Sequence, residues 1–118
     1  MHQRNNIGID ILERDDAVIV VVEGELDMSA AATFEESLSE ASAGPASTIV
    51  LDLDRVTFMD SAGVHVLLQF SLSEGNRGRV ALTPGSDQVR RLLDVTGVGR
   101  YLKFVPSPEL DDARSSAE

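Results

Sequence analysis

The stretch from residue 49 to residue 72 most strongly limits the folds open to this chain. It begins with a short β-branched apolar run at 49–51, and such a run between polar residues indicates a strand buried on both faces. After a polar break, apolar residues return at helical spacing over 64–72. The stretch therefore predicts a strand, a loop and a helix, with Asp60 and Ser61 at the N-terminus of that helix.

Asp60 and Ser61 have a plain structural role at this position. Both residue types are favoured N-caps, because their side-chain oxygens accept hydrogen bonds from the unpaired amides of the first helical turn. A second interpretation places the Ser61 hydroxyl in solvent at the positive end of the helix dipole, where an added phosphate would meet free N–H groups. The two interpretations are compatible, so Ser61 is both a candidate cap and a candidate phosphorylation site.

The rest of the chain predicts alternating strands and helices after an opening antiparallel hairpin. Asp27 or Ser29 can cap the first helix, and Ser86 or Asp87 can cap the third. Right-handed crossovers between the later strands then predict an α/β fold, with a mixed, mostly parallel sheet of about five strands and about four helices packed on it. The expected strands are 7–12, 17–23, 49–53, 80–83 and 101–105, and a weak helix is expected at 109–114.

Length and charge limit the domain count and the partners. The 118 residues suit one domain, which we place at 7–112 between flexible ends at 1–6 and 113–118. A net charge of −10 disfavours nucleic acid and anionic membranes as partners. The chain has no cysteine, and neither a leader nor a long apolar span is visible, so we expect a cytoplasmic protein without a metal or another cofactor.

Two patterns could indicate catalysis, and both have a simpler explanation. Asp52 and Asp54 follow an apolar run as in the nucleophile motif of haloacid-dehalogenase-like phosphatases, but the motif is short and common by chance. The only lysine is Lys103 in the last expected strand, and the chain is too short for the usual cap and core of such enzymes. We interpret both carboxylates as solvated residues of a strand end and a loop. Ser61 and His65 share a helix face, yet a histidine one turn along the same helix rarely points at the hydroxyl. We therefore expect no enzyme.

Taken together, these motifs resemble a known family. The segment Gly24-Glu-Leu-Asp27, the segment Phe58-Met-Asp-Ser-Ala-Gly63 and the later run at 89–97 are similar to the STAS domain, and more specifically to bacterial anti-sigma factor antagonists. The resemblance covers residues 7–105, nearly the whole chain. Asp-Ser-x-Gly alone is a weak motif, but together with the Gly-Glu-Leu-Asp loop at the right distance it is a specific one.

The resemblance implies a regulatory switch at Ser61. In the family, the serine after the aspartate is phosphorylated by the anti-sigma factor, which is itself a serine kinase of the histidine-kinase-like ATPase fold. The unphosphorylated antagonist binds this kinase and releases the sigma factor, and a PP2C-type phosphatase restores the unphosphorylated form. The implied partner surface consists of Glu25, Asp27, Asp60, Ser61, Ala62, Gly63, Val64 and His65.

The sequence departs from the family pattern at two positions. Ala62 replaces a second serine or threonine that many members have, which leaves Ser61 as the modified hydroxyl. His65 replaces a small residue that many members have, so it either selects a particular anti-sigma factor or marks a relative that binds another partner. The alternative function is a STAS protein-interaction module that is never phosphorylated, such as a scaffold or a regulator of another partner. The oligomeric state stays open between a monomer and a weak dimer.

Overall fold

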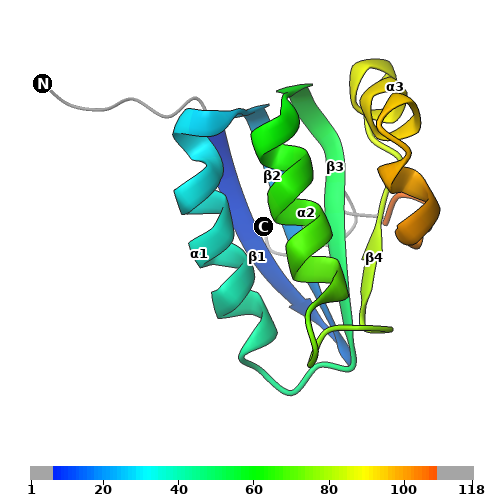
Figure 1. Ribbon diagram of the computed structural model, residues 1–118. Helices are drawn as coiled ribbons and strands as arrows, with labels where there is room; N and C mark the ends of the chain where they lie inside the picture. The colour runs from blue at the N-terminus through cyan, green and yellow to red at the C-terminus, as the bar shows by residue number, and fades with distance from the viewer. Residues whose placement is uncertain (1–6, 109–118) are drawn as a thin grey trace, which may run out of the picture.

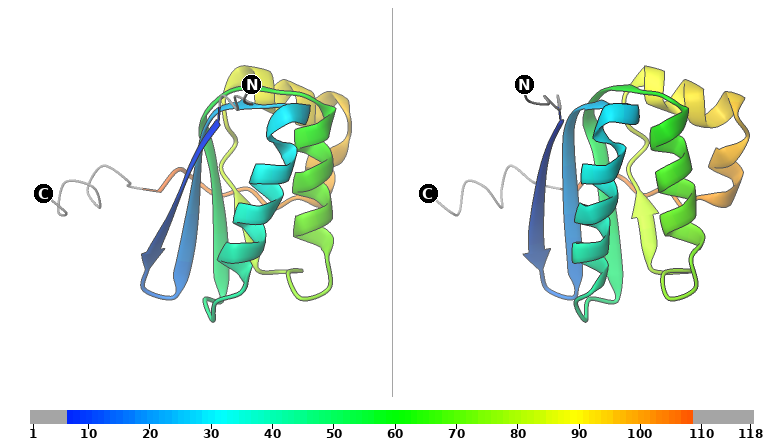
Figure 2. Two further views of the ribbon diagram at one scale, coloured as in Figure 1. Left: turned by 90° about the vertical axis from the view of Figure 1, so that its left-hand side faces the viewer. Right: turned by 60° about the vertical axis from the view of Figure 1, so that its left-hand side comes forward.

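The protein is built on one four-stranded sheet whose strands lie in sequence order. The structure, a computed structural model, describes residues 7–108. Strand β1 (Ile7–Arg14) is antiparallel to β2 (Ala17–Leu26), while β2, β3 (Thr48–Met59) and β4 (Val80–Leu82) run parallel. Helices α1 (Ala31–Ser42) and α2 (Ser61–Leu72) lie side by side on the same face of the sheet, as Figures 1 and 2 show. The predicted mixed, mostly parallel α/β architecture is confirmed.

The predicted opening hairpin is also confirmed, and its turn has a local cause. The ladder between β1 and β2 runs from the Ile7–Gly24 pair to the Arg14–Ala17 pair. Asp15 in the turn adopts a φ of 54°, a left-handed conformation that aspartate tolerates better than most residues.

The two central strands are longer than the sequence pattern predicts. Residues 24–26 were expected in a loop and 54–59 in a polar break, yet both continue as strand and pair with one another up to Leu26 and Met59. The register shifts twice along this pairing, and Gly24 has a φ of 104° at one of these irregularities. Such bulges interrupt the alternation of buried and exposed residues, so the pattern hid the end of each strand.

The helix count and the last strand also need correction. Three α-helices are present in residues 7–108, the third being α3 (Asp87–Val95), together with the 3₁₀ helices η1 (Met28–Ala30) and η2 (Val98–Tyr101). The fifth strand expected at 101–105 is reduced to one parallel bridge between Leu82 and Phe104. The helix expected at 109–114, the flexible ends at 1–6 and 113–118, and the end of the domain at 112 lie outside the described residues.

The core fills the space between the sheet and the helices. Phe34 and Leu38 of α1 and Leu67 of α2 are fully buried, and they pack against the inward side chains of the strands. The largest other fully buried side chains are Leu26, Ile49, Leu51, Leu53, Met59 and Leu82. No helix within residues 7–108 is long and apolar enough to cross a membrane.

Candidate functional site

The junction between β3 and α2 forms the cap that the sequence predicts. Asp60 is extended, with φ −118° and ψ −171°, and its Oδ1 accepts a hydrogen bond of 2.9 Å from the amide of Ala62. The Asp60 carbonyl accepts further bonds from the amides of Gly63 and Val64, at 3.1 and 3.2 Å. Three amides of the first turn therefore already have acceptors, and fewer are free for a phosphate than the sequence suggested.

Ser61 is the first residue of α2, and its side chain is exposed. Its hydroxyl forms no hydrogen bond with any of the residues described by the structure. Because Asp60 is the cap, Ser61 is not needed to pair the first-turn amides. The hydroxyl is thus accessible to a second protein, as phosphorylation would require.

Gly63 brings the start of α2 against the ends of both central strands. A Cβ atom at this position would lie 2.8 Å from the Leu26 carbonyl oxygen and 2.8 Å from Cγ of Met59. Both distances are shorter than a van der Waals contact, so only glycine fits without displacement of the helix. The close approach fixes where the exposed first turn of α2 stands relative to β2.

The loop at residues 25–27 lies beside this helix start. The amide of Asp60 donates to the Leu26 carbonyl at 3.3 Å, which ties the end of β2 to the residue before Ser61. Asp27 caps η1 through Oδ1, which accepts from the Ser29 amide at 3.1 Å and the Ser29 hydroxyl at 2.8 Å. The hydrogen bond from the Ser29 hydroxyl lowers the pKa of the Asp27 carboxyl, so this group stays ionised.

The eight residues expected at the partner surface divide into two groups. Glu25, Asp27, Asp60 and Ala62 are half-buried, and Ser61 and His65 are exposed, so these six can contact another protein. Gly63 and Val64 are buried and therefore support the surface from beneath. Met28, directly after Asp27, is 77% exposed and adds an apolar group that the sequence analysis did not select.

Gln88 of α3 is a further residue that sequence reasoning missed. Its side-chain amide forms a pair of hydrogen bonds with the backbone of Met59: Nε2 donates to the carbonyl at 3.0 Å, and Oε1 accepts from the amide at 2.9 Å. These two hydrogen bonds resemble those that a neighbouring strand would form with β3, and they hold Met59, the residue before Asp60, in place. No sequence signal could reveal it, because the contact joins residues 29 positions apart.

Asp52 does not have the solvated position that the sequence analysis assigned to it. The residue is 1% exposed within β3, and its Oδ1 accepts from the Asp54 amide at 3.0 Å and from the Thr83 hydroxyl at 3.4 Å. Burial raises the pKa of the Asp52 carboxyl, although these hydrogen bonds oppose the shift. Asp54 is exposed as expected, and it accepts from the Ser107 hydroxyl instead.

The described part of the chain also lacks a group of side chains that could hold a metal ion. Asp52 and Asp54 are engaged with different partners, and Asp52 has no access to solvent. The pair therefore does not form the open two-carboxylate site that a phosphatase would need.

Comparison with known proteins identifies the family. The STAS domain model matches residues 8–113. The anti-sigma-B factor antagonist of Listeria monocytogenes is 33% identical over 84% of this chain and 89% of its own length. The anti-sigma-F factor antagonist RsfB of Mycobacterium tuberculosis is 24% identical over 88% of this chain and 85% of its own. The chain belongs to the STAS domain family and, within it, to the anti-sigma factor antagonists.

Solved structures agree with this assignment. An anti-sigma factor antagonist from Mycobacterium paratuberculosis superimposes with a TM-score of 0.77 at 26% identity, covering 93% of this chain and 92% of that one. The phosphorylated form of SpoIIAA from Bacillus superimposes with a TM-score of 0.64 at 25% identity, covering 94% and 100% of the two chains. The resemblance that the sequence motifs indicated is therefore confirmed.

Proposed function

We propose that this protein binds an anti-sigma factor while Ser61 is unphosphorylated, and that phosphorylation of Ser61 ends the binding. Bound to the antagonist, the anti-sigma factor would release its sigma factor. The observation that supports this function best is the exposed Ser61 hydroxyl, which stands at the start of α2 and is free of capping duty because Asp60 fills that role.

The partner surface consists of the exposed and half-buried residues around Ser61. Asp27 and His65 flank it from the loop before η1 and from the next turn of α2. Met28 supplies a large apolar side chain next to the acidic loop. A partner that fits this surface has a basic rim and an apolar recess, since acidic groups attract cations and an exposed methionine gains from burial.

Electrostatics explain how one phosphate could prevent docking. A phosphoserine has a charge of about −1.5 to −2, and here the carboxylate of Asp60 is its sequence neighbour. Because three first-turn amides already have acceptors, the helix N-terminus offers little compensation for that charge. A protein that closes over Ser61 would have to desolvate the phosphate and the nearby carboxylates together. The free-energy cost of this desolvation exceeds the free energy gained from the contact unless the partner supplies extra cations. No rearrangement of the fold is required.

The family resemblance supports a proposal for the modifying enzymes. We infer that the kinase is the anti-sigma factor, a serine kinase of the histidine-kinase-like ATPase fold, and that a PP2C-type phosphatase removes the phosphate in the cytoplasm. The structural neighbour SpoIIAA has been solved in a phosphorylated form, which supports phosphorylation in a protein of this shape. The protein itself would act by binding and not as an enzyme.

Intact-mass spectrometry tests the modification. The protein is incubated with a candidate anti-sigma factor kinase and Mg-ATP, and one added phosphate is expected on the wild type and none on Ser61→Ala. Transfer to Ser61→Ala would show that another hydroxyl is modified and would contradict the assignment of the switch to Ser61.

Titration calorimetry tests the consequence for binding. Ser61→Ala should bind the anti-sigma factor as tightly as the unmodified protein, while Ser61→Asp should bind about tenfold or more weakly because it adds a charge inside the interface. Gln69→Glu adds a negative charge on an exposed position of the same helix and serves as the control, with affinity expected to change little. Equal affinities of Ser61→Ala and Ser61→Asp would refute the charge mechanism and favour a STAS module that is not switched by phosphate.

A further inference from the structure

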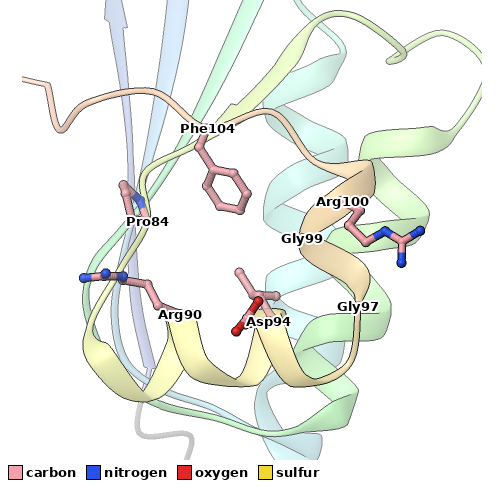
Figure 3. Close-up of a pocket in the computed structure, with 8 residues that line it drawn as sticks. Pro84, Arg90, Asp94, Gly97, Gly99, Arg100 and Phe104 are labelled. Carbon is pink, nitrogen blue, oxygen red and sulfur yellow. The ribbon is translucent and has the colours of Figure 1, made fainter.

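A pocket of about 420 Å³ lies between α3, η2 and the segment that contains Phe104. Its apolar wall is formed by Pro84, Leu93 and Phe104, and Figure 3 shows the Phe104 ring facing α3 across the opening. Pockets of a few hundred Å³ with mostly apolar walls are the usual sites for small organic ligands. None of the residues proposed to bind the anti-sigma factor lines this pocket.

Backbone contacts fix the shape of the pocket. Phe104 is held between two hydrogen bonds to Leu82: the Leu82 amide donates to the Lys103 carbonyl at 2.8 Å, and the Val105 amide donates to the Leu82 carbonyl at 2.9 Å. Gly97 ends α3 with a φ of 78°, and a Cβ there would meet no atom within 4 Å. The wall is thus anchored to the sheet on one side and leaves open space at the glycine on the other.

The charge around the pocket is opposite to that of the whole chain. The charged residues that line the pocket are Arg90, Arg100 and Asp94, which gives the lining a net charge of +1 in a protein of net charge −10. Arg90 and Arg100 line the pocket from opposite ends of its α3–η2 side, and in Figure 3 their guanidinium groups point outward, with Asp94 between them.

Both arginines can turn toward a ligand at little cost. The ion pair of Arg90 with Asp87 is 3.6 Å long, and its side chains are 61% and 103% exposed, so solvent screens the interaction and little is lost when it breaks. Long arginine stems have several rotatable bonds, and a guanidinium group binds carboxylate and phosphate through paired donors.

We propose that this pocket binds an amphipathic organic anion. Its aromatic or acyl body packs against Leu93, Pro84 and Phe104, and its carboxylate or phosphate is held by Arg90 at one end of the pocket. Asp94 rejects a second negative charge near the middle of the site, so a single anionic group at one end of the ligand fits best. The proposal does not depend on the switch at Ser61.

Three probes of equal body size test the proposal by ¹H–¹⁵N NMR titration of the full chain. We expect saturable shifts of the amides of residues 90–104 with 2-naphthoate or 2-naphthyl phosphate, with a Kd of about 1 mM or below. The neutral 2-naphthamide should bind about tenfold more weakly, since it cannot form charge-assisted hydrogen bonds. The difference between the carboxylate and phosphate probes identifies the preferred head group.

Charge-reversal variants provide the matched control. Arg90→Glu should weaken binding of the preferred anion about tenfold. Arg100→Glu, at the opposite end of the pocket, should weaken it less, because it changes only the more distant charge. Arg91→Glu changes the net charge by the same amount and lies on the same helix as Arg90, but Arg91 does not line the pocket. The affinity of this variant for the anion should therefore stay within about twofold of that of the wild type. Unchanged melting curves confirm that the variants are folded. Absent or unsaturable shifts, equal binding of 2-naphthamide, or equal losses in all three variants would overturn the proposal.

Discussion

Substitution of Gly63 by alanine tests whether the start of α2 depends on close contact with the sheet. In an exposed helix the change would stabilise the protein by about 1 kcal/mol, because alanine has the higher helix propensity. Here the added methyl group would lie 2.8 Å from a backbone oxygen of Leu26 and 2.8 Å from Cγ of Met59, a side chain that is 1% exposed. The Leu26 oxygen also accepts a hydrogen bond of 3.3 Å from the amide of Asp60, so a shift of this oxygen would weaken the bond that holds the cap residue.

The balance of these effects gives a measurable loss. Overpacking in a well-packed core costs about 1–3 kcal/mol, and we expect the upper part of that range because one clash is with backbone. Net of the helix propensity, Gly63→Ala should lower the free energy of unfolding by about 1–2 kcal/mol, which is a fall in Tm of about 4–8 °C for a domain of this size. Valine at this position should cost more.

Thermal and urea denaturation, followed by circular dichroism, measure this loss. Gly75→Ala is the control, because Gly75 is exposed and a Cβ there would meet nothing within 4 Å. Its free energy of unfolding should change by no more than about 0.5 kcal/mol. A Gly63→Ala protein as stable as the wild type would refute the inference that α2 stands in forced contact with β2 and β3.

Two further substitutions test buried features outside α2. Asp52→Asn keeps an oxygen for the Asp54 amide but removes the buried charge. Since the folded-state pKa of Asp52 is raised, the wild type loses stability as pH rises from the ordinary aspartate pKa through the folded value. The Asp52→Asn variant should therefore be more stable than the wild type at pH 7, with an advantage that shrinks toward pH 4, and a pH-independent difference in urea unfolding would contradict this. Gln88→Ala removes two hydrogen bonds to Met59 and should cost about 1–2 kcal/mol and speed amide exchange at Met59, whereas Gln69→Ala should do neither.

The helix-start chemistry could be predicted from the sequence because it is local. A cap needs only a short polar side chain two or three residues before the amides it binds, and Asp60 and Ser86 fill that role for α2 and α3. Asp27 caps η1, whereas α1 has no side-chain cap. The apolar spacing of α1 likewise placed Phe34 and Leu38 in the core. The same local reasoning placed Ser61 at the start of the helix, and the structure shows that its side chain is exposed.

The features that the sequence did not reveal all depend on partners far along the chain. Parallel pairing across a bulged register extends β2 and β3 beyond their apolar runs, and it encloses Asp52 where the residue pattern suggested solvent. Gln88 reaches Met59 only because α3 packs near the end of β3, and the arginine-lined pocket exists only where α3, η2 and the Phe104 segment meet.

Residue type and short-range spacing were thus enough to indicate the α/β class, the residues from which each helix cap is drawn and Ser61 as a candidate phosphorylation site, since these depend on hydrogen bonds and periodicities within a few residues. The role of Ser61 as a switch came from the family resemblance. Strand lengths, the burial of Asp52, the close contact at Gly63 and the pocket were decided by tertiary packing. The physical reason is that burial and steric contact are properties of the surroundings of a residue, which the chain assembles from segments tens of residues apart.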